Sequence, residues 1–228
     1  MRAAADVSPT VRGTGCDTPI EEWLETDLHV WTRKVVARHL HPETGSPYWL
    51  RRAARLDFDP RDITRYQRLT AFGPFPSLRS QDPADPVPLD VPRPLTGPVR
   101  DTDGPTGTQL SPDIYRDFEA AMDDGICGRS YGNTLGNAAG PPVEQNAEIM
   151  PYAPDYPQVT MNAVRKEDWS TAVEYGTVGE VRLTVPHDDL FLPHILERDQ
   201  APRYDTDSRW PSGGVANVTP LRTTSSAP

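Results

Sequence analysis

Cysteine is scarce in this chain of 228 residues, which contains only Cys16 and Cys127. Two cysteines this far apart give neither the framework of a small disulfide-rich domain nor the ligand spacing of a zinc site. The scarcity excludes both classes of protein and favours a reducing cytoplasm as the location.

Long hydrophobic runs and an excess of basic residues are also missing. No apolar stretch approaches membrane-spanning length, and residues 1–11 lack the apolar core of a signal peptide. We therefore expect a cytoplasmic protein that does not associate with membranes. The 23 Lys and Arg residues against 33 Asp and Glu residues give a net charge of −10. This acidic balance argues against nucleic acid as a partner.

Proline is abundant, with 26 residues, more than twice its average share. Nine of these prolines lie in the stretch from Pro74 to Pro105, both included. Proline removes a backbone donor and fixes φ, so this stretch cannot form a regular helix and is disfavoured as a central strand. It is predicted to be an extended crossing segment.

The composition shifts divide the chain into regions. The two ends are small and polar, and we expect both to be disordered. Between them the pattern predicts one domain of the mixed α/β or α+β class, with helices first and strands last. The regions are a disordered start at 1–17, a domain at 18–218 (helical in 18–70, proline-rich in 71–110, helix then strands in 111–218) and a disordered tail at 219–228.

Three helix starts stand out in the first part of the domain. Thr18, Pro19 and Glu21 have the pattern of a capping box. The apolar residues that follow at helical spacing predict one helix from Thr18 to about His41. They are Ile20, Leu24, Leu28, Trp31 and Val35. Ser46-Pro47 and Asp59-Pro60 predict the starts of two further helices, and Trp23 and Trp31 are assigned to the core.

The second part of the domain is predicted to contain one helix, from Ser111 to Gly125, followed by strands. A short strand over 126–131, in which Cys127 is assigned to the core, leads into a loop at 132–142 that is rich in Gly, Asn, Ala and Pro. Apolar or alternating runs predict three further strands. They lie in 148–152, 158–164 and 179–185.

One loop has the composition of a phosphate site. The stretch 99–109 alternates hydroxyl residues with glycines, which let backbone N–H groups approach phosphate oxygens. The residues concerned are Thr102, Gly104, Thr106, Gly107 and Thr108. Asp103 adds a negative charge there and Pro105 removes a donor, and the loop has no lysine of the kind that ends a P-loop. A plain Gly/Thr turn is the alternative interpretation.

Two later segments complete the candidate site. In Arg129–Gly136, Tyr131 could stack on an adenine ring, while Asn133 and Thr134 could contact phosphate; the alternative is a strand that turns sharply at Gly132. In Glu197–Ser208 an acidic residue could accept hydrogen bonds from ribose hydroxyls; the alternative is a charged surface loop.

In this order, the three segments resemble the adenylate-forming superfamily of acyl-CoA synthetases and ligases. Within this superfamily, the chain looks more closely like the branch of phenazine antibiotic biosynthesis proteins, relatives of phenylacetate–CoA ligases. That family has a Thr/Ser/Gly phosphate loop, then Tyr-Gly-x-Thr, then Arg-Tyr-x-Thr-Gly-Asp. The opening stretches Tyr48–Arg52 and Leu56–Ile63 and the run Gly179–Thr184 also match family segments.

The resemblance implies where a nucleotide would be held. Besides the five loop residues named above, Tyr131, Gly132 and Thr134 match the segment on the adenine side. Arg203, Tyr204 and Thr206 match the start of the ribose segment. The family's ribose-binding aspartate falls at Ser208 here, so Asp207, one position earlier, is the candidate.

The resemblance also implies a reaction, in which ATP and a carboxylic acid give an acyl-adenylate and pyrophosphate, with Mg²⁺ on the phosphates and an aromatic acid as substrate. The cofactors expected by resemblance are ATP or AMP and Mg²⁺.

Measured against the family, we expect an internally deleted chain that ends at Pro228 before the C-terminal lid, and hence little or no activity. The alternative is a non-catalytic interaction module, which forms homo-oligomers or associates with a full-length ligase.

A second cluster of ionisable residues lies in Pro186–His194, which holds two histidines and two aspartates. Such a set could bind a divalent metal. His187 and His194 are separated by a Phe-Leu-Pro break, which is no known ligand spacing, so a capped turn after a strand is the favoured interpretation.

Overall fold

The computed structural model describes residues 22–74, 129–133, 136–140, 149–206 and 210–221. The predicted phosphate loop, the predicted helix at 111–125, Cys127 and the capping box at Thr18 lie outside the described residues. So do residues 1–17 and 222–228, and the division into one domain with disordered ends stays a prediction for them.

Helix α2 (Leu28–His39) begins later than predicted. A helical turn at 22–24 is closed by the Thr26 hydroxyl, which donates to the Glu22 carbonyl. The Asp27 carboxylate then accepts from the N–H groups of His29 and Val30, at 2.8 and 2.9 Å. An N-cap of this kind starts a new helix, so the prediction of one continuous helix was wrong.

The next two predicted helix starts are correct, although only one begins an α-helix. Helix α3 (Pro47–Ala53) follows Ser46. After Asp59, whose carboxylate accepts from the Arg61 N–H, the chain forms two 3₁₀ segments, η1 (Pro60–Asp62) and η2 (Tyr66–Phe72). Ile63 is extended between them and buried, so the predicted third helix is interrupted by a core contact.

The rest of the described chain is a curled sheet of eight strands in the order β1-β2-β3-β7-β6-β5-β4, with β8 paired to β6. Every described strand pair is antiparallel. The strands are β1 (Arg129–Asn133), β2 (Gly136–Gly140), β3 (Pro151–Pro154), β4 (Thr160–Val164), β5 (Val178–Pro186), β6 (Phe191–Tyr204), β7 (Gly214–Ala216) and β8 (Thr219–Pro220). The predicted mixed class is confirmed, and the antiparallel pairing makes the fold α+β.

All four predicted strands are present, and three segments that were predicted to be irregular also contain strands. β1, β3, β4 and β5 match the predictions within a few residues. β2 lies inside the predicted loop at 132–142, and β6 runs through the segment whose alternative was a charged surface loop. β8, in the predicted tail, pairs with Asp199 and Gln200. In each case hydrogen bonds to a neighbouring strand override local preferences for a loop.

The sheet buries an apolar core along its own strands. Met161, Ala163, Val181, Leu183 and Val215 are all fully buried. The pairs Tyr152↔Val215 and Arg203↔Val215 place side chains of β3, β7 and β6 on one face of the sheet. Tyr131 lies on this face too, since its partner Ala138 pairs with Pro154 of β3.

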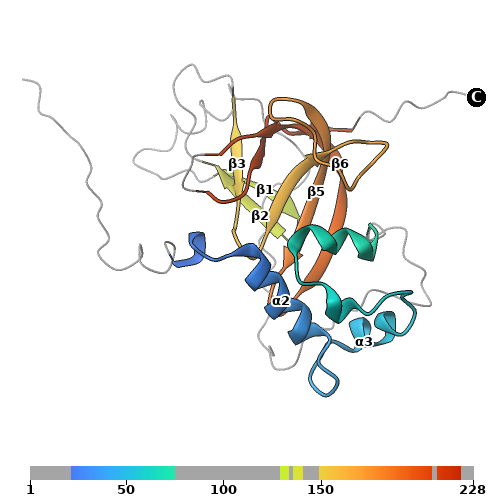
Figure 1. Ribbon diagram of the computed structural model, residues 1–228. Coiled ribbons are helices and arrows are strands. Elements are labelled where there is room, and N and C mark those ends of the chain that lie inside the picture. Colours follow the sequence, from blue (N-terminus) through green and yellow to red (C-terminus); the bar gives the residue numbers. More distant parts are fainter. Residues whose placement is uncertain (1–21, 75–128, 134–135, 141–148, 207–209, 222–228) are drawn as a thin grey trace, which may run out of the picture.

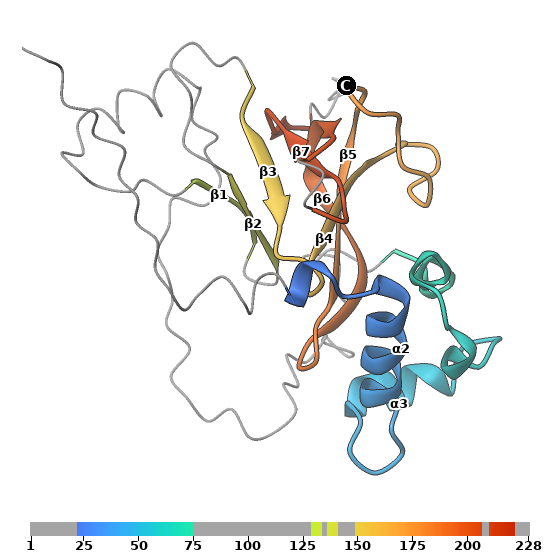
Figure 2. The same ribbon diagram turned by 60° about the vertical axis from the view of Figure 1, so that its left-hand side comes forward.

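The helical segment packs on one side of the sheet, beside the ends of β5 and β6 (Figures 1 and 2). Trp49 lies at the centre of this contact, with its ring centroid 5.0 Å from that of Phe72 and 4.8 Å from that of Phe191. The Trp49 indole N–H also donates to the Phe191 carbonyl at 2.9 Å. Trp31 is partly buried against the core, as predicted, but Trp23 is 46% exposed, so its assignment to the core was wrong.

None of the described helices is both long enough and apolar enough to cross a membrane.

Candidate functional site

The structure describes part of the predicted nucleotide site. Tyr131 and Gly132 of the second segment are described, as are Arg203, Tyr204 and Thr206 of the third. The remaining predicted residues lie outside the described part of the chain. They are Thr102, Gly104, Thr106, Gly107, Thr108, Thr134 and Asp207.

Tyr131 joins the second segment to the third. It lies in β1, opposite the fully buried Ala138, and its ring centroid is 5.8 Å from that of Tyr152. Its hydroxyl donates to Oδ2 of Asp199, in β6, at 2.9 Å. Burial, and next the Asp199 carboxylate, raise the pKa of Tyr131 well above its usual value. The phenol is therefore a neutral donor whose ring is fixed at both ends.

Gly132 does not mark the predicted turn. β1 continues to Asn133, and Gly132 pairs with Asn137 of β2. Gly132 has φ +152°, which other residues rarely adopt. The glycine therefore allows β1 to take this backbone conformation next to Tyr131.

The described residues of the ribose segment make contacts with residues other than Tyr131. The Arg203 guanidinium lies 4.0 Å from the centre of the Tyr175 ring, and its Nη1 donates to the Val173 carbonyl at 3.0 Å. The Thr206 hydroxyl donates to the Ser212 carbonyl at 2.8 Å. These contacts fix the end of β6. The hydrogen bond from Tyr131 goes instead to Asp199, which precedes the matched ribose residues within Glu197–Ser208.

Asp199 and Arg182 are the polar residues of the sheet that the sequence analysis missed. Asp199 lies in a segment so rich in charge that no single carboxylate stands out. Arg182 is 6% exposed, and its Nη1 donates to the carbonyls of Trp169 and Ser170 at 2.9 and 3.1 Å. Burial lowers the pKa of Arg182 from its usual value. Arg182 lies between Val181 and Leu183 in β5, so its side chain is on the other face of the sheet from theirs, and this alternation is the sequence signal for it.

The cluster in 186–194 is a capped turn, as favoured. His187 and Leu190 exchange backbone hydrogen bonds at 3.0 and 3.3 Å, and Nδ1 of His187 accepts from the Asp189 N–H. His194 lies farther along β6, where its ring faces Trp169 and its Nδ1 shares a hydrogen bond with the Thr184 hydroxyl. In the described part of the chain, no three metal-ligating side chains come together.

Comparison with known proteins adds one structural likeness. No family model matches the chain, and no curated protein matches it. Among solved structures, apo MatB from Rhodopseudomonas palustris is similar to it with a TM-score of 0.34 and 16% sequence identity. The likeness covers 50% of this chain and 24% of that chain, so this chain spans about a quarter of the matched protein.

At that TM-score the overlap carries no argument about fold or function, and membership of the adenylate-forming superfamily is therefore a proposal.

Proposed function

We propose that this chain is related to the ATP-dependent ligases that adenylate carboxylic acids, and that it binds adenine nucleotide with little or no turnover. The finer proposal places it in the branch of phenazine antibiotic biosynthesis proteins and phenylacetate–CoA ligases, with an aromatic acid as substrate and the cytoplasm as location. The order of the three sequence segments is the basis of both.

The observation that carries the proposal is the hydrogen bond from Tyr131 to Asp199. Tyr131 belongs to the segment that the resemblance assigns to the adenine. Asp199 lies in the charged stretch Glu197–Ser208, shortly before Arg203, where the matched ribose segment starts, and the two residues are 68 positions apart in the chain. A single nucleoside can be contacted by both segments only if they lie together. The contact supports the proposal because it brings them within hydrogen-bond distance.

The described residues suit the binding of a nucleoside better than catalysis. An aromatic ring fixed by Tyr152 on one side and by Asp199 at its hydroxyl can hold a base with little loss of side-chain freedom. Asp199 is a second candidate, besides Asp207, for the carboxylate near the ribose. Since no three ligands come together among the described residues, Mg²⁺ would arrive on the ATP phosphates.

Replacing Tyr131 by alanine is expected to weaken ATP binding by about tenfold or more, because stacking on an aromatic ring is worth about 1–3 kcal/mol per base. Tyr131→Phe keeps the ring and should bind within about threefold of the natural protein. Isothermal titration calorimetry with ATP and Mg²⁺ makes the measurement, and Trp23→Ala, which removes an exposed aromatic, is the control. Equal affinity in Tyr131→Ala, or no binding to the natural protein, contradicts the proposal.

Adenylation is expected to be at background level. Asp103 places a carboxylate in the phosphate loop and Pro105 removes a donor, and loss of such electrostatic stabilisation commonly costs about a hundredfold or more in rate. Exchange of labelled pyrophosphate into ATP, with a panel of aromatic acids, measures this directly. Exchange well above a no-enzyme control would show that the chain is an active ligase.

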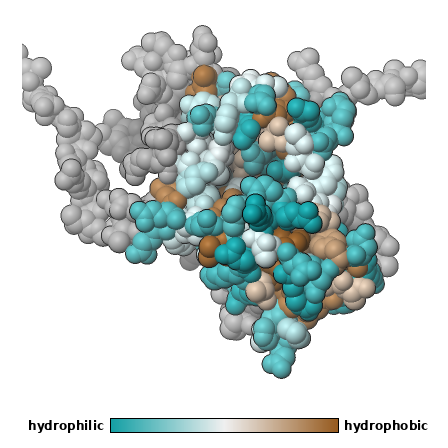
Figure 3. Space-filling model, in the orientation of Figure 1, coloured by the Kyte–Doolittle hydropathy of each residue, from teal (hydrophilic) through white to brown (hydrophobic). Residues whose placement is uncertain are grey.

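A non-catalytic interaction module is the second candidate. Its support is the set of large hydrophobic side chains that are about half exposed, namely Trp23, Val30, Ile149, Tyr175 and Val178. On the face in Figure 3, however, hydrophobic residues are interspersed among hydrophilic ones. Association with itself or with a full-length ligase, without nucleotide binding, would favour this candidate.

A further inference from the structure

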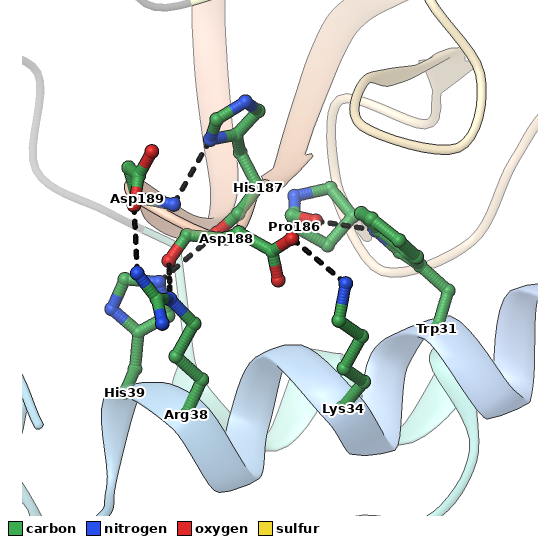
Figure 4. Close-up of polar contacts among 8 residues, drawn as sticks. All are labelled: Trp31, Lys34, Arg38, His39, Pro186, His187, Asp188 and Asp189. Atoms are coloured by element: carbon green, nitrogen blue, oxygen red, sulfur yellow. Dashed lines mark hydrogen bonds and ion pairs between the residues drawn. The ribbon is translucent and has the colours of Figure 1, made fainter.

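Helix α2 is joined to the turn between β5 and β6 by a set of polar contacts, which we call the clasp (Figure 4). The Trp31 indole N–H donates to the Pro186 carbonyl at 2.6 Å, and Nε2 of His39 donates to the His187 carbonyl at 3.0 Å. Arg38 donates through Nε to the Asp188 carbonyl at 2.6 Å. Two ion pairs, Lys34–Asp188 and Arg38–Asp189, complete the clasp at 2.8 and 2.9 Å.

The buried histidine is the critical member of the clasp. Three of the four side chains in the ion pairs are more than one-third exposed. Each ion pair therefore contributes little to stability. His39 is 2% exposed and lies against the Phe191 ring. Its Nε2–H donates to the His187 carbonyl, while its buried Nδ1 has no hydrogen-bond partner among the described residues. A second proton on this ring would therefore be an unpaired buried donor carrying a charge.

The charges around His39 do not offset the free-energy cost of protonating its buried ring. Asp188 and Asp189 face it from the turn and favour its protonated form, but both are already paired with Lys34 and Arg38. Arg38 lies next to it, and Arg61 of η1 bonds to the neighbouring Leu40 carbonyl. Burial is the largest influence, and it lowers the pKa of His39 below its usual value.

Two other histidines, His29 and His187, accept hydrogen bonds that support this contact. Nδ1 of His29 accepts from the Tyr66 N–H at 3.2 Å, which ties the start of α2 to η2. Nδ1 of His187 accepts from the Asp189 N–H at 3.0 Å, inside the turn itself. The contact between α2 and the β5–β6 turn is therefore supported by hydrogen bonds of three histidines, of which His39 is the buried one.

We propose that the clasp is an acid-sensitive device, in which protonation of His39 releases α2 from the β5–β6 turn before the sheet itself unfolds. The sheet keeps its own buried core, which includes Met161, Leu183 and Val215, and its strand pairing does not involve α2. The device follows from the clasp alone and is independent of nucleotide binding.

Nuclear magnetic resonance of the full chain tests the proposal. The indole N–H signal of Trp31 reports the clasp, and the amide signals of Val181 and Val215 report the sheet. On acidification from about pH 7.5 to about pH 4.5, the Trp31 signal should move to the position of a solvent-exposed indole while both amide signals stay in place. Loss of all three signals at one pH would overturn the proposal.

His39→Gln provides the matched variant, since a glutamine amide can still donate to the His187 carbonyl but takes up no proton. The pH midpoint of the Trp31 change should fall by at least about one unit in this variant. His41→Gln is the control, because His41 is exposed and its Nδ1 accepts only from the N–H groups of Glu43 and Thr44, outside the clasp; in this variant the midpoint should stay within about 0.3 units. An unchanged midpoint in His39→Gln would overturn the proposal. If this variant does not fold, the ring protons of His39 in the natural protein must titrate with the Trp31 midpoint, and a different midpoint overturns it.

Discussion

Replacing Trp49 by alanine is expected to lower the free energy of unfolding by about 3–5 kcal/mol. Trp49 is 3% exposed and contacts the rings of Phe72 and Phe191, so the helical segment and the sheet share it. Its removal leaves a cavity at that contact and an unpaired Phe191 carbonyl. Denaturation by urea, followed by circular dichroism, gives the change.

Two further variants separate the causes of this loss. Trp49→Phe keeps most of the ring but removes the indole N–H, and should cost about 1–2 kcal/mol. Trp23→Ala removes a tryptophan that is 46% exposed and should change stability by less than about 0.5 kcal/mol. A loss below about 1 kcal/mol in Trp49→Ala would mean that the helices do not pack on β6 as described.

Acidification is expected to destabilise the fold through His194. This residue is 1% exposed in β6, and burial, assisted by the nearby Arg182 charge, lowers its pKa to about 3. The unfolded chain takes up a proton near the usual pKa of about 6.5, whereas the folded chain does not. Stability therefore falls as the pH drops below about 6.5, by about 1.4 kcal/mol per unit from this group, until the folded value is reached.

Urea titrations at pH 7 and at pH 5 measure the effect, which should be about 2 kcal/mol from His194. His194→Asn has no titrating ring, and its loss of stability between the two pH values should be smaller than that of the natural protein by about this amount. His39 adds a further loss in both proteins, since its pKa is also lowered. An identical loss in the two proteins would show that His194 is charged in the folded state.

Local patterns in the sequence correctly predicted where helical segments start, but they did not predict where those segments are interrupted. Ser46-Pro47 and Asp59-Pro60 mark true starts, because a proline in the first turn and a capping carboxylate act within a few residues. The apolar spacing from Leu24 to Leu28 continues across Asp27, so the periodicity hides the break that the Asp27 cap imposes. Capping and periodicity compete there, and the cap prevails.

Contacts between distant segments account for the features that the sequence did not reveal. β6 contains Pro193 and Pro202 and many charges, yet it is a strand because β5, β7 and β8 all pair with it. Asp199 likewise gains its importance from Tyr131, 68 positions away. Neither the pairing of β6 with these strands nor the hydrogen bond of Asp199 can be predicted from the residues next to them in the sequence. Tyr131 itself was identified because it stands in a recognisable motif.

Photolabelling with an azido-adenine analogue of ATP tests most directly whether the Tyr131 and Asp199 segments form one nucleotide site. We expect the label on peptides that contain residues 129–140 or 191–206, and we expect excess ATP to prevent it. Tyr131→Ala should reduce the labelling of both. Labelling confined to other peptides, or labelling that ATP does not prevent, would contradict the account.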